Sequence, residues 1–230
     1  MELKINNLTK LYDSNGGIKN ITFKLKQGEC LGLIGHNGAG KTTLLRLLAT
    51  LLRPNRGNII FNNKDITTDE INYRKLIGYM PEDAGLYKKE TAFSNLYFYS
   101  RFYDDISEDD IKNKLKEYEL STSKKVGSFS KGMKQKVLFI KAILNNPKLL
   151  LLDEPLSGLD PGMRIMVKDK LKKYQKQGTS IIISTHILSE IYEICDRFVI
   201  MKNGEIKSDV YKTELSNQTE LEENYKVIMK

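Results

Sequence analysis

The sequence has no tryptophan, two histidines, five prolines and two cysteines among its 230 residues. With so few cysteines it is no disulfide scaffold, and Cys30 and Cys195 each lie in an apolar run, as packed thiols of a reducing compartment do. No apolar run approaches the roughly 18 residues that a transmembrane helix needs. The first residues lack the pattern of a signal peptide, so we expect a cytoplasmic chain.

Acidic residues are the less common charged type: the sequence has 29 aspartates and glutamates and 37 lysines and arginines, which gives a net charge of +8. Such an excess fits nucleic acid, an anionic membrane surface or a lysine-rich background. The lysines are scattered, which favours a background with some attraction to anionic lipid. The 40% hydrophobic and 29% charged content is typical of a globular protein. The length suits one α/β domain with a sizeable core.

One segment organises the chain. It follows an apolar run, Cys30–Ile34, that predicts a buried strand, and it precedes a predicted helix that reaches about Leu52, before Pro54. The segment fits G-x-x-x-x-G-K-[ST], and this strand–loop–helix context favours a phosphate-binding P-loop over a glycine-rich turn. Its residues are Gly35, His36, Asn37, Gly38, Ala39, Gly40, Lys41 and Thr42.

The chemistry of a P-loop follows from its backbone. Glycines allow successive N–H groups to point at one anion, and the start of the next helix adds positive potential. We expect Lys41 to reach the β- and γ-phosphates and the Thr42 hydroxyl to bind Mg²⁺. His36 is expected to face solvent.

Two carboxylates follow another buried strand. Leu149–Leu152 is a continuous apolar run, as in a parallel strand covered on both faces, and Asp153 and Glu154 come next. Ligands of open α/β sheets bind at this carboxyl edge, so Asp153 is predicted to hold Mg²⁺ and Glu154 to act as general base. His186 follows the strand Ser180–Ser184 and could orient water or Glu154. A structural histidine is the alternative, and the position of His186 favours function.

The remaining pattern predicts further elements in chain order. Strands are expected at 3–5, 21–25, 57–61 and 77–80, with a hairpin loop at 13–17 and a helix at 70–76. Asp160 and Pro161 predict the start of a helix to about Lys176. A helix at 187–195 and a hairpin through Asn203 and Gly204 follow. The stretch from Leu215 is polar and weakly helical.

Between Glu82 and Asn145 the strand signal fades, and we expect an inserted helical lobe. Ser107 and Asp110 mark a helix start, and another helix is expected over 130–144. Residues 92–103 are rich in aromatic side chains at helical spacing. We interpret these as core rather than as a ligand box.

On these motifs, the chain resembles the nucleotide-binding subunit of an ATP-binding cassette (ABC) transporter over residues 1 to 210. Segment 35–42 resembles the Walker A motif of the family, and segment 149–154 resembles Walker B with its catalytic glutamate. Segment 157–160 resembles the D-loop, and His186 resembles the switch histidine. Segment 129–133 resembles its signature, usually Leu-Ser-Gly-Gly-Gln. The resemblance implies an α/β fold: a P-loop NTPase (RecA-like) core with a mainly parallel sheet, an antiparallel β subdomain and an inserted helical lobe.

The resemblance also implies a domain plan and a site. An ATPase domain, 1–215, would consist of a core lobe (1–81 and 146–215) and a helical lobe (82–145), followed by a tail (216–230). Two domains would pair head to tail, each signature covering the other's ATP. Tyr12 would stack on adenine, unless it is only a surface tyrosine. The implied nucleotide-binding residues are Tyr12, Gly35, His36, Asn37, Gly38, Ala39, Gly40, Lys41, Thr42, Thr43, Ser130, Gly132 and Asp160; the Mg²⁺ ligands are Thr42, Glu82 and Asp153; the catalytic residues are Glu154 and His186.

Three positions depart from the family pattern. Glu82 replaces the usual glutamine after the strand that ends at Met80, and a carboxylate can still bind Mg²⁺. Lys131 and Met133 replace a glycine and the glutamine of the signature. These changes resemble exporters whose permease is a separate chain.

We therefore expect an ATP-hydrolysing subunit that binds ATP and Mg²⁺, dimerises on ATP and drives a separate membrane permease, an exporter by resemblance, at the inner face of the cell membrane. A homodimer is expected, and nucleic acid is not an expected partner. Two alternatives remain: a soluble ABC protein acting on nucleic acid or ribosomes, and a nucleotide-dependent binding module without turnover. No residue of the sequence identifies the transported substrate.

Overall fold

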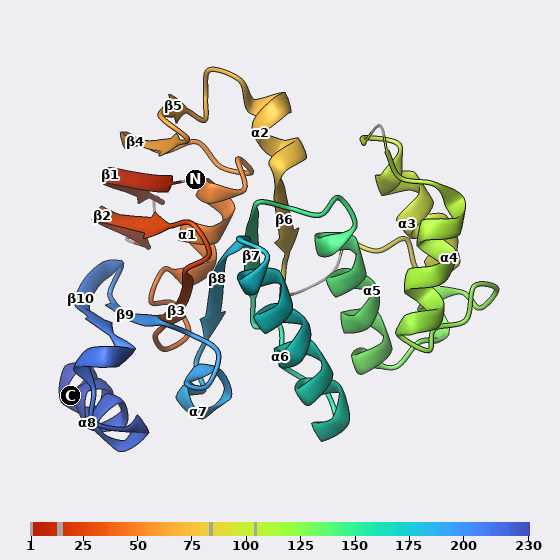
Figure 1. Ribbon diagram of the computed structural model, residues 1–230. Helices are drawn as coiled ribbons and strands as arrows, with labels where there is room; N and C mark the ends of the chain where they lie inside the picture. The colour runs from red at the N-terminus through yellow and green to blue at the C-terminus, as the bar shows by residue number, and fades with distance from the viewer. Residues whose placement is uncertain (1, 13–15, 83–84, 104) are drawn as a thin grey trace.

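The computed structural model describes residues 2–12, 16–82, 85–103 and 105–230. Its strands form two sheets, one antiparallel and one mostly parallel, with helices packed around them (Figure 1). In this part of the chain no helix is long and apolar enough to cross a bilayer.

The larger sheet has the strand order β10-β9-β3-β8-β7-β6. Every residue of β3, β7 and β8 is buried, which is why their sequences are continuous apolar runs. All neighbours run parallel except β9 and β10, which form the expected hairpin through Asn203 and Gly204, both with positive φ. The strands are β3 (Cys30–Ile34), β6 (Ile77–Met80), β7 (Leu149–Asp153), β8 (Ser180–Thr185), β9 (Arg197–Lys202) and β10 (Glu205–Tyr211).

Strand register brings four carboxyl ends to one edge. Ile34 pairs with Thr185, Asp153 with Ser184, and Met80 with Leu152. The segments that follow β3, β6, β7 and β8 therefore emerge side by side. Each of them carries residues singled out from the sequence.

The smaller sheet has the order β2-β1-β4-β5 and is antiparallel throughout. Its strands, β1 (Glu2–Leu11), β2 (Gly17–Lys26), β4 (Arg56–Phe61) and β5 (Lys64–Asp65), confirm the expected pairing but are longer than the alternating segments predicted. Most of the hairpin loop expected at 13–17 lies outside the described residues. Asn62 and Asn63, both with positive φ, form the turn between β4 and β5.

Two helices end earlier than predicted. α1 (Lys41–Leu48) stops because Thr50 takes a positive φ of 55°, with Thr50 N–H donating to Leu47 and Leu51 N–H to Arg46, a Schellman ending without glycine. The helix expected at 187–195 is reduced to α7 (Leu188–Ile191), since the chain must turn to enter β9. The predicted α2 (Glu70–Leu76) and α6 (Pro161–Lys176, capped by Asp160) are confirmed.

The described residues between 82 and 145 form helices joined by loops, as expected. They form α3 (Ala92–Ser100), α4 (Glu108–Glu117, with the Ser107–Asp110 capping box) and α5 (Lys131–Ile143, capped by Ser130). Figure 1 shows α3 and α4 on the side of the parallel sheet away from the antiparallel sheet. The division into core and helical lobes at these boundaries stays a prediction.

The core interpretation of the aromatic segment is wrong for part of it. The buried residues of α3 are Ala92, Asn95, Leu96 and Ser100, and of its aromatic side chains Phe93 packs partly against the core while Phe98 faces solvent. Phe98 is 46% and Phe102 61% exposed, and the Phe98 ring lies 5.6 Å from that of Phe102.

The polar end of the chain is a packed helix rather than a loose tail. α8 (Gln218–Met229) buries Leu221 completely, and the Lys202 ammonium donates to the Ile228 carbonyl over 2.6 Å. In Figure 1, α8 lies beside β9 and α7.

Candidate functional site

The loop after β3 is built on glycines for two different reasons. Gly38 and Gly40 have φ of 84° and 104°, which favours glycine. Gly35 is needed for space, because a β-carbon there would lie 2.6 Å from the Met201 carbonyl oxygen. Gly40 caps α1 without a side chain, so the first N–H groups of the helix are free to meet an anion.

Lys41 is the first residue of α1 and is 6% exposed. Its ammonium donates to the carbonyls of Gly35 (2.6 Å) and His36 (3.3 Å) and lies 4.0 Å from a Glu154 carboxylate oxygen. Burial lowers the pKa of Lys41, and the nearby carboxylates Glu154, Asp153 and Glu82 oppose that shift. A buried cation held mainly by carbonyl oxygens is well placed to take a phosphate.

Asp153 ends β7 and is 1% exposed. The Ser184 hydroxyl donates to its Oδ1, whereas Oδ2 is buried with no hydrogen-bond partner among the described residues. An orphaned carboxylate oxygen at this edge fits a divalent cation, which prefers oxygen ligands. Thr42 lies in the first turn of α1. Glu82, exposed after β6, lies close enough for its carboxylate to raise the pKa of Lys41.

Glu154 and His186 are in direct contact. His186 Nδ1 lies 2.9 Å from Glu154 Oε1, and the Thr185 hydroxyl donates to Glu154 Oε2 over 3.3 Å. Glu154 is 6% exposed and has a φ of 49°, in the left-handed region that costs a non-glycine residue about 1–3 kcal/mol. The strained backbone aims the carboxylate between Lys41 and His186.

The other expected nucleotide-binding residues fall into two groups. Tyr12, 38% exposed, has its hydroxyl 3.5 Å from the Thr43 hydroxyl, beside the P-loop, while His36 is exposed, as expected. Ser130 caps α5, and Gly132 lies in its first turn, where a β-carbon would lie 3.4 Å from the Gly158 carbonyl oxygen. Over the described ranges, no hydrogen bond or ion pair joins either to residues 35–43. Printed contacts thus join the P-loop lysine, Glu154 and His186 directly, whereas the described residues show no such contact between the P-loop and Ser130 or Gly132.

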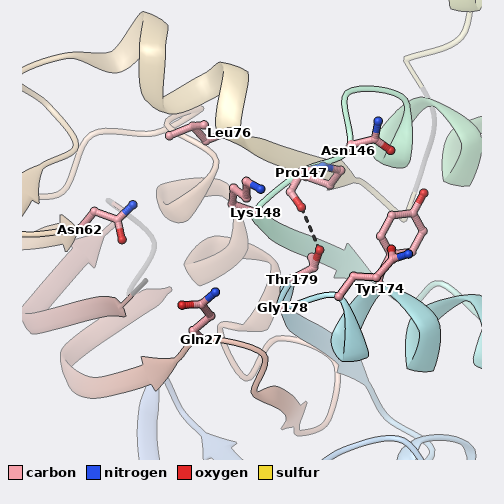
Figure 2. Close-up of a pocket in the computed structure, with 10 residues that line it drawn as sticks. Gln27, Asn62, Leu76, Asn146, Pro147, Lys148, Tyr174, Gly178 and Thr179 are labelled. Atoms are coloured by element: carbon pink, nitrogen blue, oxygen red, sulfur yellow. Dashed lines mark hydrogen bonds between the residues drawn. The ribbon is translucent and has the colours of Figure 1, made fainter.

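A cavity of about 650 Å³ lies away from this edge (Figure 2). Gln27, Lys148 and Thr179, which line it, precede β3, β7 and β8, so it opens at the amino ends of the strands. There the Thr179 hydroxyl donates to the Pro147 carbonyl over 3.0 Å, which joins the segments that precede β7 and β8 (Figure 2). A phosphate site needs the opposite edge, where the glycine loop and the free helix start lie.

Comparison with known proteins decides the family. The family model for ABC transporters matches residues 18–157, more than half of the chain. The chain belongs to the ABC transporter family. It is 37% identical, over 94% of its length and 74% of the relative's, to YxlF, an uncharacterized ABC transporter ATP-binding protein of Bacillus subtilis. It is 33% identical, over 95% of its length and 92% of the relative's, to SkfE of B. subtilis, a SkfA peptide export ATP-binding protein.

Solved structures agree. An ATP-binding subunit of an ABC transporter matches all of both chains with a TM-score of 0.89 and 32% identity. A dimeric ATP-binding cassette in a post-hydrolysis state, bound to ADP and Pi, matches 91% of this chain and 98% of its own with a TM-score of 0.82 and 25% identity. The ABC protein described here is thus an ATP-binding subunit with the ABC ATPase fold, as its motifs predicted.

Two site residues were missed from the sequence. Ser184 fixes Asp153 through its hydroxyl, and Thr185 does the same for Glu154. Both end the strand beside β7, so hydroxyls next to the carboxylates across a parallel pair were the signal available.

Proposed function

We propose that this ABC protein hydrolyses ATP in a head-to-tail dimer of two copies and so drives a separate membrane permease that exports its cargo. The observation that carries the proposal is the Glu154 carboxylate, buried between the P-loop ammonium (4.0 Å) and His186 (2.9 Å). A buried carboxylate beside the γ-phosphate position is suited to accept a proton from water.

Each residue has a distinct role in this proposal. Backbone N–H groups of the P-loop and Lys41 bind the phosphates, and Tyr12 stacks on adenine. Glu154 accepts a proton as a water oxygen bonds to the γ-phosphorus and the bond to the β-phosphate oxygen breaks, releasing ADP and phosphate. His186 holds Glu154 and the water in line.

Mg²⁺ fits the residues present. Thr42, Asp153 through its orphaned Oδ2, and Glu82 would hold it, and when bound it would neutralise charge on the phosphates. Glu82 supplies a full negative charge where the family usually has a neutral amide.

In this proposal a second copy of the chain completes the nucleotide site with its signature segment. Ser130, Gly132 and Asp160 would meet the partner copy's ATP, which explains why the signature lies apart from the P-loop of its own chain. The dimeric relative supports this arrangement.

An exposed aromatic surface supports docking of an integral membrane protein. We define it as Tyr87, Phe98 and Phe102, exposed by 52%, 46% and 61%, with the Phe98 ring 5.6 Å from each of the other two. Such a cluster at a surface suits a protein partner. The relative named for peptide export supports the outward direction.

Glu154→Gln tests the chemistry. The amide keeps the shape and the His186 contact but accepts no proton, so ATP should bind while hydrolysis falls at least about 10²-fold. Light scattering should then find an ATP-dependent dimer that persists. Wild-type hydrolysis by this variant would refute the assignment of the base.

Phe98→Ser with Phe102→Ser tests the partner. Basal ATPase of the isolated chain should not change, because neither ring touches the ATP edge, but co-purification with an integral membrane protein should be lost. Ile71→Ser is the matched control, since Ile71 is 74% exposed on α2, outside the aromatic surface. Unchanged co-purification of the double variant, or an equal loss with the control, would count against this surface.

A further inference from the structure

Arg164, in the first turns of α6, joins two segments that follow the residues proposed to be catalytic. Its Nε donates to the Leu159 carbonyl over 3.1 Å, and its Nη1 lies 3.0 Å from Glu190 Oε1 in α7. Leu159 belongs to the loop that runs from Glu154 to α6, and Glu190 follows His186 closely in the chain. One guanidinium thus connects the segment after Glu154 to the segment after His186.

The charge of Glu190 is balanced by this arginine. Glu190 is 8% exposed, and the contact is an ion pair rather than an aligned hydrogen bond, because Glu190 Oε1 accepts none among the described residues. A buried carboxylate is costly unless a cation compensates it. The pair with Arg164 therefore favours the one position of α7 in which Glu190 faces the guanidinium.

α7 needs such support from outside itself. It has only four residues, and a single helical turn is unstable on its own. The N-cap residue, Ile187, makes no side-chain hydrogen bond to the turn. Leu188 and Ile191 pack into the core, but hydrophobic contacts are non-directional and fix the rotation of a short turn poorly. An ion pair with a fixed partner supplies that direction.

His186 stands just before this turn, and its side chain is 49% exposed. Packing alone therefore leaves the ring free to move, although its Nδ1 lies 2.9 Å from Glu154 Oε1. We propose that Arg164 is a positioning residue for ATP hydrolysis: through Glu190 it holds the first turn of α7 and so keeps His186 directed at Glu154. The inference rests on the catalytic roles proposed above for His186 and Glu154.

The role predicts a change in kcat without a change in ATP binding. Over the ranges that the structure describes, neither Arg164 nor Glu190 forms a hydrogen bond or ion pair with residues 35–43, so KM for ATP should change less than about twofold. Misplacing a reacting group by about 1 Å can cost 10²-fold in rate, and a partial displacement of His186 should lower kcat about tenfold. An arginine that only stabilised the fold would not separate kcat from KM in this way.

The test measures steady-state ATP hydrolysis by the full chain with Mg·ATP. Arg164→Met removes the cation, and Arg164→Met with Glu190→Gln removes both charges, so that no buried carboxylate is left unpaired. Lys168→Met is the matched control, since Lys168 lies one turn further along α6 and pairs over 3.7 Å with Glu193, whose side chain is 65% exposed. We expect both Arg164 variants to lower kcat about tenfold and the control to lower it less than about twofold.

The decisive comparison repeats the double variant in a His186→Ala chain. Because Arg164 acts through His186, the two losses should not multiply, and kcat should stay within about twofold of that of His186→Ala alone. If the unsubstituted chain does not hydrolyse ATP, or His186→Ala keeps its kcat, the proposed function fails and this inference fails with it.

Other results overturn the role of Arg164 alone. They are an unchanged kcat in the Arg164 variants while His186→Ala lowers it, a rise in KM that accounts for the loss, or an equal loss in Lys168→Met. Losses that multiply in the His186→Ala chain, or a double variant that is unfolded in urea titration, would likewise leave Arg164 with a purely structural role.

Discussion

Gly78 controls how closely the signature helix approaches the sheet. It lies in β6, and a β-carbon there would lie 1.8 Å from the Ala142 carbonyl oxygen in α5 and 2.9 Å from Leu150 Cδ1. Real β-carbon contacts stay above 3.0 Å, so Gly78→Ala requires the helix backbone to retreat by about 1.2 Å. The retreat would separate α5 side chains such as Phe139 and Ile143, both 1% exposed, from their neighbours.

We expect Gly78→Ala to lower the free energy of unfolding by about 3 kcal/mol, the upper end for overpacking, because the obstacle is backbone. In urea this corresponds to a midpoint lower by about 1 M. Gly85→Ala is the control, since its β-carbon would meet only the Tyr99 hydroxyl at 3.9 Å, and it should shift stability by less than about 0.5 kcal/mol. A midpoint for Gly78→Ala equal to that of the control would refute the close packing of α5 on β6.

Three further predictions concern charges. Arg197 binds Asp209 (2.5 and 2.6 Å) and Glu29 (3.3 Å) while 7% exposed, so Arg197→Met should cost about 3–5 kcal/mol in urea unfolding, and adding Glu29→Gln and Asp209→Asn should recover part of it. His186→Ala should lower kcat about 10²-fold with little change in ATP affinity; a loss below threefold would make the Glu154 contact incidental. Because burial lowers the pKa of Lys41 below its ordinary 10.5, ATP affinity should fall on the alkaline side before an exposed lysine would titrate. In that window the unfolded chain binds more protons at this residue than the folded chain, so the Lys41 contribution to the free energy of unfolding rises while affinity declines, and Lys41→Arg should remove the pH dependence of both.

Elements with strong local signals were predictable from the sequence. The boundaries of α2 and β6, the Ser107 capping box and the Asn203–Gly204 hairpin follow from caps, turn residues and periodicity, which act within a few residues. The carboxyl-edge site followed too, because each motif residue comes just after a buried strand and parallel strands place such positions together.

The misses have causes that hydrophobic periodicity and standard turn residues do not reveal. α1 ends at Leu48 because Thr50 takes a conformation usually left to glycine, and α7 is short because the chain enters β9, where the Asp196 N–H donates to the Cys30 carbonyl over 2.8 Å. The aromatic segment was misinterpreted because a polar residue occupies its inward face. Asn95 is 1% exposed and is satisfied by the backbone of Tyr87 and Thr91, a partnership that periodicity alone does not reveal.

The left-handed backbone at Glu154 implies that the residue proposed to hydrolyse ATP also lowers the stability of the fold. Glycine at this position would relieve the conformational cost and remove a buried carboxylate. Glu154→Gly is therefore expected to raise the free energy of unfolding and to abolish ATP hydrolysis. Selection of this chain for heat resistance alone would thus favour variants that have lost the Glu154 carboxylate and with it ATP hydrolysis.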